Sequence, residues 1–292
     1  MLLGLSEVAF WGAIETGLVY SFVALGVYIS FRVLDFPDLT VDGSFPLGGV
    51  VCAAFLLSGW DPWLSMIFAF FAGCLAGFVT SFISVRFGIL HLLASILTMT
   101  ALNSINIRIN NGPNQPLLGV DVFYGSDFSD YVSRSFSVSL IVIFVLVLLG
   151  LYLSSETGLA MRATGANSRM ARANGVQTTL HVMFGIALSN GLVSLAGALY
   201  AQLNGSADTN SGVGTIVAGL AALILGETLF PSRRLKYILL ACIAGSVTYR
   251  FALALALEYR PSWMVASDLN LITSVLMLVA LLLPRYWRKR NI

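Results

Sequence analysis

The sequence predicts an all-α protein, a polytopic bundle of transmembrane helices that forms a single domain over residues 1–292. Composition is the first observation, because 58% of the residues are hydrophobic and only 10% are charged. A soluble domain cannot bury that much apolar surface. The second observation is that several apolar runs reach about 20 residues, the length that crosses the hydrocarbon core. A transmembrane β-barrel would show short strands of alternating hydrophobicity instead.

Nine apolar segments follow one another along the chain, and each predicts a helix in the membrane. They occupy approximately residues 9–31, 43–59, 62–85, 87–106, 136–154, 179–203, 213–229, 236–257 and 268–284. The segments 179–203 and 213–229 are rich in Gly, Ala and Ser, which allow helix backbones to approach closely in lipid. We therefore expect these two segments to form a tight helical core.

The positive charges orient these segments, because loops on the cytoplasmic side carry an excess of Lys and Arg. The densest basic cluster is Arg285-Tyr-Trp-Arg-Lys-Arg290, which predicts a cytoplasmic C-terminus. Counting back by alternation places the central stretch 155–178 and Arg32 inside. The same count places the N-terminus outside.

The first segment contains a carboxylate, Glu15, a few residues from its outer end. A charged side chain at a helix centre costs about 2.5–3.5 kcal/mol, and less near the edge. Two alternatives stay open: Glu15 faces a watery path, or it reaches toward the membrane surface.

A polar stretch between the first two segments predicts a broken helix near residues 36–44. Pro37 prevents a continuous helix, and Asp42 is placed to cap the helix that follows. One interpretation is a cytoplasmic connection with a capping Asp. The other is unwound backbone that lines a cavity, because irregular backbone is not tolerated against lipid. In that case short polar side chains would offer replaceable hydrogen bonds to a solute, between two apolar gates. These residues are Asp38, Thr40, Asp42 and Ser44, with Phe36 and Phe45 as the gates.

Amide side chains form a second candidate set. Asn103, Asn106 and Asn110 are spaced i, i+3 and i+7, which places them on one helix face. Asn190 lies in the middle of the segment 179–203. Such amides either bond to a neighbouring helix or contact a solute, and we include Asn103, Asn106 and Asn190 in the predicted substrate path.

The central stretch 155–178 predicts a short, capped, basic helix. Asn167 can accept hydrogen bonds from the first turn, residues 168–173 favour helix, and Asn174-Gly175 offers a left-handed stop. The helix would have about two turns and a length of roughly 10 Å. It carries Arg169 and Arg172, with Arg162 upstream. This stretch is either a surface that another protein binds, or a loop whose positive charge reflects only its location on the cytoplasmic side of the membrane.

The sequence also excludes several kinds of chemistry. Its lysines, Lys236 and Lys289, follow no G-x-x-x-x-G pattern, so any ATP chemistry must come from a partner. Neither a H-E-x-x-H motif nor a paired catalytic set occurs in the apolar segments. We therefore predict no catalytic residue, no metal site and no cofactor in this chain.

The segment from Thr157 to Gly175, with Ala163-Thr-Gly-Ala-Asn167 inside it, resembles the cytoplasmic loop of permease subunits of ATP-binding-cassette (ABC) importers. The group is the branched-chain amino acid and simple-sugar type. Residues 194–197 and 218–228 look like its core segments, although Glu227 stands where members often have Gly. The sequence of residues 36–45 resembles that of a subgroup of amino-acid permeases, some of them associated with aromatic amino acids. The resemblance covers residues 16–285.

The resemblance implies a homodimer in the bacterial cytoplasmic (inner) membrane that moves a small polar solute, most readily an amino acid, by alternating access. Two cytoplasmic ATPase subunits, which bind the ATP and Mg, would grip the central stretch. An extracytoplasmic solute-binding protein would deliver the solute. The coupling residues would be Arg162, Gly165, Asn167, Arg169, Met170, Arg172 and Gly175. The alternative function is a secondary transporter driven by an ion gradient, with Glu15, Asp38 or Asp42 as its coupling carboxylate.

Overall fold

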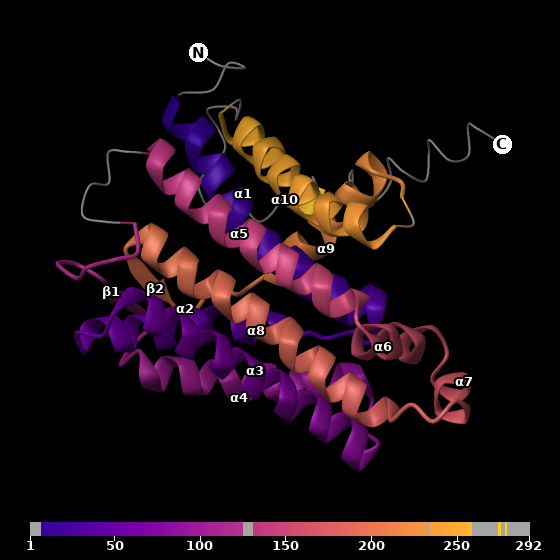
Figure 1. Ribbon diagram of the computed structural model, residues 1–292. Coiled ribbons are helices and arrows are strands. Elements are labelled where there is room, and N and C mark those ends of the chain that lie inside the picture. The colour runs from indigo at the N-terminus through magenta and orange to yellow at the C-terminus, as the bar shows by residue number, and fades with distance from the viewer. Residues whose placement is uncertain (1–6, 125–130, 233, 259–273, 276–277, 279–292) are drawn as a thin grey trace.

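The computed structural model describes residues 7–124, 131–232, 234–258, 274–275 and 278, and these residues are almost entirely helical (Figure 1). The elements in chain order are α1 (Glu7–Val27), the π-helix η1 (Tyr28–Val33), α2 (Val41–Leu57), α3 (Pro62–Phe87), α4 (His91–Ile109), β1 (Asn114–Pro116), α5 (Tyr131–Ser154), α6 (Glu156–Ala166), α7 (Ser168–Ala173), α8 (Thr178–Asn204), β2 (Ser206–Asp208), α9 (Thr215–Leu229) and α10 (Leu235–Glu258).

The first eight predicted apolar segments each coincide with one of these helices. Six apolar helices in the described part of the chain are long enough to cross a membrane, whereas α2 and α9 are shorter. The ninth predicted segment, 268–284, lies outside the described residues except for positions 274, 275 and 278. The all-α membrane architecture is therefore confirmed, and the count of nine stays a prediction.

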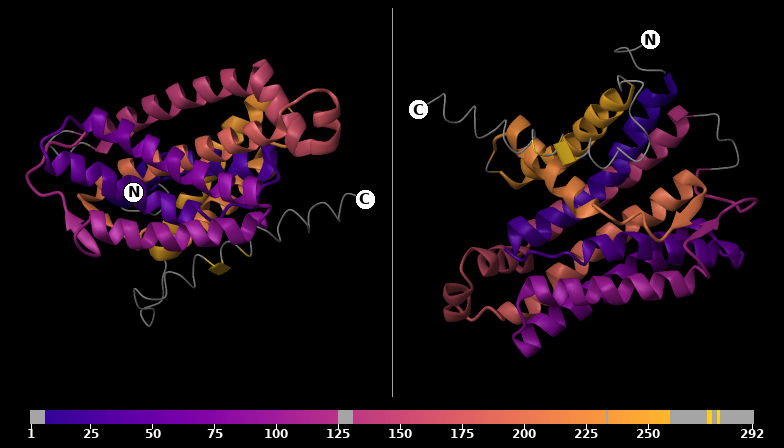
Figure 2. Two further views of the ribbon diagram at one scale, coloured as in Figure 1. Left: turned by 90° about the horizontal axis from the view of Figure 1, so that it is seen from below. Right: turned by 180° about the vertical axis from the view of Figure 1, so that it is seen from behind.

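The helices form two layers (Figures 1 and 2). In one layer, here called the α8 layer, α2 and α3 pack on α8, and α4 packs on α2 and α3. In the other, the α1 layer, α9 and α10 pack against α1, and α5 lies along α1. Because α1 also packs on α8, the seam between the layers runs along these two helices.

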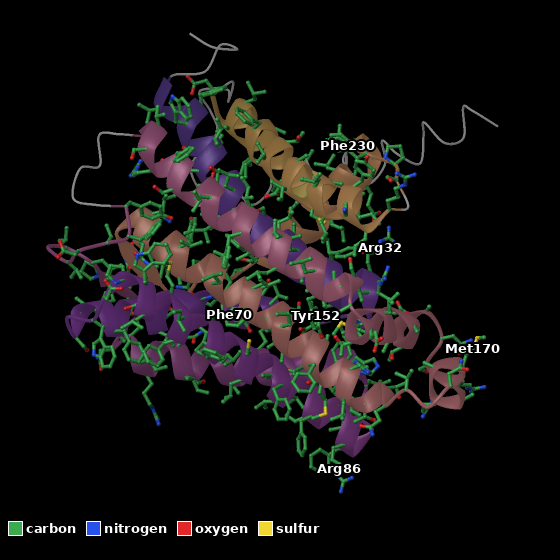
Figure 3. All side chains as sticks on the ribbon, viewed as in Figure 1. Arg32, Phe70, Arg86, Tyr152, Met170 and Phe230 are labelled. Atoms are coloured by element: carbon green, nitrogen blue, oxygen red, sulfur yellow. The ribbon has the colours of Figure 1, made fainter. Side chains whose placement is uncertain are left out.

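Apolar side chains cover the outer faces of the bundle (Figure 3). Leu75 on α3 is 67% exposed, and Phe136 and Leu151 on α5 are 69% and 65% exposed. Large apolar side chains at such exposure would be unfavourable in water but suit the hydrocarbon of a membrane. These faces are consistent with a multi-pass membrane protein.

Small residues hold the α8 layer together. A Cβ at Gly48 of α2 would collide with the Ser194 carbonyl of α8, and one at Gly73 of α3 would collide with the Asn190 carbonyl. The Ser194 hydroxyl also donates to the Ala69 carbonyl at 2.6 Å. Close backbone approach of this kind drives helix association in lipid through van der Waals contact. The prediction of a tight core is confirmed for residues 179–203, but the second small-residue segment, 213–229, packs as α9 mainly on α10 and α1 rather than with α8 in one tight core.

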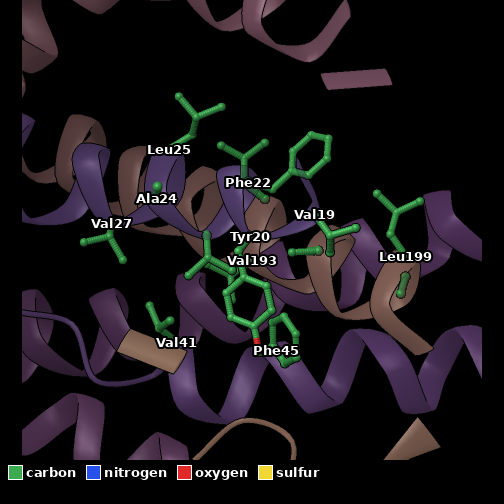
Figure 4. Close-up of a cluster of buried hydrophobic side chains, with 14 of the residues drawn as sticks. Val19, Tyr20, Phe22, Ala24, Leu25, Val27, Val41, Phe45, Val193 and Leu199 are labelled. Carbon is green, nitrogen blue, oxygen red and sulfur yellow. The ribbon is translucent and has the colours of Figure 1, made fainter. Parts of the chain in front are cut away.

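The largest apolar core lies at the seam. Phe22 and Val27 of α1 pack with Phe45 of α2 and with Val193 and Leu199 of α8, and all five side chains are fully buried (Figure 4). The seam is therefore closed in this conformation.

The first break in the helical pattern lies at residues 34–40. α1 ends in η1, the chain then runs without helix, and α2 begins at Val41. Asp35 adopts a φ of 52°, in the left-handed region that ends helices. The predicted break is confirmed, but it lies a few residues earlier than 36–44. The reason is that the Gly43 and Ser44 amides already bond to the Thr40 carbonyl and start α2.

The two strands close the end of the bundle opposite α6 and α7 (Figure 1). They pair antiparallel, with Asn114 opposite Asp208. The pairing ties the connection after α4 to the turn between α8 and α9.

Candidate functional site

A buried polar network occupies the break and its surroundings. The Asp38 carboxylate accepts from the Thr40 amide at 2.9 Å and from the Asn190 side-chain amide at 2.6 Å. Asn190 Oδ1 in turn accepts from the Ser44 hydroxyl at 2.7 Å. The hydroxyls of Thr40 and Thr80 lie 2.9 Å apart. The structure thus joins four predicted path residues and adds Thr80.

The five side chains of this network have no solvent exposure. In a low-dielectric interior such bonds are strong, and an unpaired member is costly. Segment 34–40 is therefore irregular backbone with alternating burial: Asp38 and Thr40 face the protein interior, whereas Asp35 and Pro37 are exposed. In this conformation the side chains of the network bond to one another and are closed to solvent.

Asp42 does not cap its own helix, so that prediction is wrong. The N-cap of α2 is Thr40, which makes no side-chain capping bond. The Asp42 carboxylate instead accepts from the amides of Gly214 at 3.3 Å and Ile216 at 2.8 Å, at the start of α9. Helix side chains lean toward the N-terminus, and α9 begins beside that point. Asp42 therefore satisfies amides that α9 cannot bond internally.

The two short helices thus meet at their N-termini. α2 has 17 residues and α9 has 15. At 1.5 Å per residue α9 is about 22 Å long, and its far end holds Glu227 against Arg32 at the surface. The N-termini of α2 and α9 meet deep in the bundle. At such positions, the half-length helices of transporters present the positive ends of their dipoles to a polar solute.

An aromatic cluster lies next to the N-termini of α2 and α9, at the seam between the two layers. The Phe45 ring lies 5.4 Å from the Tyr20 ring and 5.5 Å from the Tyr200 ring. Tyr20 and Tyr200 contact each other edge to face at 5.9 Å. Figure 4 shows the Tyr20 phenol reaching Phe45 across the layers. The Arg250 guanidinium carbon lies 3.5 Å from the centre of the Tyr20 ring.

Other predicted path residues lie elsewhere. Phe36 is buried against the His91 ring at 4.1 Å. Asn106 is buried and donates to the Gly43 carbonyl at 3.1 Å, beside the start of α2. Asn103 is exposed, so it does not join Asn106 and Asn110 in the protein interior, although the helical spacing places the three on neighbouring positions at the C-terminal end of α4. The buried face of α4 follows an i, i+4 spacing through residues 102, 106 and 110.

Sequence reasoning missed Arg250, Tyr20, Tyr200 and Thr80. A signal existed for Arg250, because an arginine inside an apolar run is rare and marks function. No pattern pointed to the tyrosines, since aromatic residues are common in membrane helices.

The central stretch folds largely as predicted. The Asn167 side chain accepts from the amides of Arg169 and Met170, both at 3.1 Å, and so caps α7. α7 has six residues and ends before Gly175, whose φ is 81°. The predicted cap and left-handed stop are confirmed.

The surface of α7 combines positive charge with one apolar side chain. Arg169 and Arg172 are exposed, and Met170 is 66% exposed and projects at the tip of the molecule (Figure 3). Ala171 is buried on the opposite side. An exposed methionine flanked by arginines is a good contact for another protein.

α6 connects this surface to the break. A Cβ at Gly165 would collide with the Val33 carbonyl, so α6 lies directly on η1. Arg162 is half-buried on the same helix. Beside α7 a pocket of about 510 Å³ is lined by residues of α5, α6 and α8 and of the connection after α7, among them Tyr152, Gln177 and His181.

The remaining membrane carboxylate, Glu15, is paired. Its buried Oε1 forms an ion pair with Arg134 Nε of α5 at 3.2 Å, and Arg134 Nη2 donates a hydrogen bond to Oε2 at 3.3 Å. Neither alternative for Glu15, a watery path or a reach to the surface, fits this burial. Glu227 pairs with Arg32 at the end that carries α6.

Comparison with known proteins gives consistent results. The family model described as "Branched-chain amino acid transport system / permease component" matches residues 11–283. A tyrosine transport system permease protein of Clostridioides difficile (strain R20291) is 36% identical over 90% of this chain and 87% of its own. A ribose import permease protein of Bacillus subtilis (strain 168) is 24% identical over 77% of this chain and 67% of its own. The structure of PsaBC from Streptococcus pneumoniae in complex with Fab shares the fold, with a TM-score of 0.52 at 16% identity, and the match covers 94% of this chain and 90% of that one.

Proposed function

The chain belongs to the permease family of branched-chain amino acid transport systems, and we propose that it is the membrane-spanning subunit of an ABC importer for an amino acid. The relative at 36% identity is named for tyrosine transport, whereas the ribose permease is 24% identical. This difference favours an amino acid over a sugar.

The proposed mechanism is alternating access driven by a partner ATPase. The ATPase subunit would grip α7 through Met170 and the flanking arginines. The contact between Gly165 and the Val33 carbonyl is the observation that carries this proposal, because it joins the gripped surface to η1. Movement of α6 would then shift segment 34–40 and open the network around Asp38 and Asn190. The two layers would part at the seam and expose the path.

The proposed orientation follows the positive charges. The end with α6 and α7 would lie in the cytoplasm, and the positive charges of Arg162, Arg169 and Arg172 on it support this orientation. The N-terminus and the β1–β2 end would then face outward, where a solute-binding protein docks, and the C-terminus would lie inside. Two copies of the chain would pair with two ATPase subunits.

An ion-gradient-driven carrier needs a carboxylate that is free to bind the coupling ion. Glu15 is paired with Arg134, Asp42 holds two amides of α9, and Asp38 is bonded to Thr40 and Asn190. Because each of these three carboxylates already has partners, the ATP-driven mechanism is favoured over the ion-driven one.

The test is uptake by proteoliposomes that contain the chain with the ATPase and solute-binding protein encoded beside it. We expect uptake of radiolabelled L-tyrosine or L-leucine with ATP and Mg²⁺ inside, and none with ADP. Met170→Asp should keep the fold but lose ATP-dependent uptake, whereas Met170→Leu, which keeps an exposed apolar side chain at the same position, serves as the control. Uptake driven by a proton or sodium gradient without ATP would contradict the mechanism. Uptake of ribose alone would contradict the solute class.

A further inference from the structure

Arg250 is a positive charge far inside an apolar helix. The charged residues of α10 are Lys236, Arg250 and Glu258. At 1.5 Å per residue Arg250 lies about 22 Å from the start of α10 and about 12 Å from its end. A charge at this depth is costly unless it is paired, and such residues mark solute or ion pathways.

Arg250 has no acidic partner within the described part of the chain. The ion pairs there join Arg32 to Glu227 and Arg134 to Glu15. Arg250 Nε is buried and makes no hydrogen bond to any described residue. Its guanidinium lies over the face of Tyr20, whose side chain offsets its charge in part. The Nε–H donor is left without a partner, and the planar guanidinium that carries it suits a carboxylate.

The position of Arg250 is fixed by close packing of α10 on α1. One turn earlier, the Ser246 hydroxyl donates to the Gly17 carbonyl at 2.6 Å. A Cβ at Gly17 would lie 2.9 Å from the Val247 backbone. Helices clamped this closely hold the guanidinium over Tyr20, as a recognition site requires.

A polar pocket lies at the end that carries the strands and includes one residue of the aromatic cluster. It has a volume of about 290 Å³, and its lining includes Asn114, Ser206, Asp208, Ser211 and Tyr200. Tyr200 contacts Tyr20, so the wall of the pocket adjoins the ring that carries Arg250. An amino acid that enters there would meet polar groups first, then aromatic rings, then the guanidinium.

We propose that Arg250 binds the carboxylate of an aromatic amino acid during translocation, with Tyr20, Phe45 and Tyr200 packing around the ring of that solute. This inference rests on the proposed function and names the group that selects its solute. In the present conformation the three rings contact one another and the site is closed. Separation of the α1 and α8 layers opens it, because Tyr20 and Arg250 lie on one layer and Phe45 and Tyr200 on the other.

The test compares L-tyrosine with L-tyrosine amide, which keeps the ring and the amino group but lacks the carboxylate. Equilibrium binding is measured on the purified permease–ATPase complex in nanodiscs, without the solute-binding protein. We expect wild type to bind L-tyrosine at least about tenfold more tightly than the amide, as for a hydrogen bond to a charged group. Arg250→Gln should abolish this preference, and Arg250→Lys should keep part of it. A fault in folding would weaken both ligands equally and leave their ratio unchanged.

Arg108→Gln, at an exposed arginine in the last turn of α4, is the matched control and should behave as wild type. Uptake with the complete system gives the second readout, in which Arg250→Gln should lower L-tyrosine uptake at least about tenfold while basal ATP hydrolysis persists. The inference is overturned if Arg250→Gln keeps the preference for tyrosine over its amide, or if wild type has none. If wild-type proteoliposomes take up no amino acid at all, the proposed function itself fails.

Discussion

Replacement of Asp42 tests how the two short helices are joined. Its carboxylate accepts from two backbone amides of α9, at Gly214 and Ile216. Asp42→Ala removes both acceptors and leaves two part-buried amides unsatisfied. Each unsatisfied buried donor costs about 1–3 kcal/mol, so we expect the free energy of unfolding to fall by an amount in the lower part of the range of about 2–6 kcal/mol.

Asp42→Asn separates the hydrogen bond from the charge. The amide side chain keeps one carbonyl oxygen, which can still accept from Ile216, the nearer amide at 2.8 Å. An exchange among good capping residues is a small change, so we expect a loss of about 1 kcal/mol, mainly from the weaker attraction to the α9 dipole. Asp61→Ala is the matched control, because Asp61 caps α3 through one exposed bond to the Trp63 amide. It should cost about 0.5–2 kcal/mol.

The assay is reversible unfolding of the purified protein in mixed micelles, followed by helical circular dichroism, together with uptake by proteoliposomes. The expected order of stability is wild type, Asp42→Asn, then Asp42→Ala, and uptake should fall most in Asp42→Ala because the start of α9 loosens. Equal stability of all three proteins would show that Asp42 does not hold α9. Equal loss in both variants would show that its charge, rather than its capping geometry, is what matters.

Three further predictions follow from the ion pairs and from α6. Arg134→Gln should cost about 3–5 kcal/mol because the buried carboxylate of Glu15 loses its cation, whereas the double variant with Glu15→Gln should be more stable than Arg134→Gln alone in the same unfolding assay; additive losses would contradict the pairing. Glu227→Gln should cost under about 1 kcal/mol because Arg32 and Glu227 are partly exposed, and a larger loss measured by thermal unfolding would contradict a surface role. Gly165→Ala should keep ATP hydrolysis but lower uptake, because the added methyl group pushes α6 away from η1, and normal uptake would show that this contact does not transmit movement.

The sequence predicted the elements whose causes are local. Apolar length fixed eight of the helices to within a few residues, and the cap and stop of α7 depend on Asn167 and Gly175 alone. The break after α1 was predictable because Pro37 cannot continue a helix. Asp38, Thr40 and Ser44 were recognised as candidates for the same reason.

The sequence could not predict which distant groups the polar side chains meet. Asp42 has the spacing of a cap for α2, but α9 begins beside it in space, and its amides had no other partner. Asn103 and Asn106 both fit a helical period, and only the packing of α4 on α2 decides which is buried. Arg250 was detectable as a charge in an apolar run, but its place over Tyr20 depends on how α1 and α10 pack.

The central claim is that ATP-driven movement opens the polar network around Asp38, Ser44 and Asn190 to the solute. The most direct measurement is the labelling rate of Ser44→Cys by a hydrophilic thiol reagent, in a protein whose cysteines Cys52, Cys74 and Cys242 are replaced by alanine. Ser81→Cys is the control, because Ser81 bonds within its own helix. The account predicts that labelling of Ser44→Cys rises during ATP turnover and falls when L-tyrosine is added, while Ser81→Cys is unchanged. A rate at Ser44→Cys that is the same with and without ATP would contradict the account.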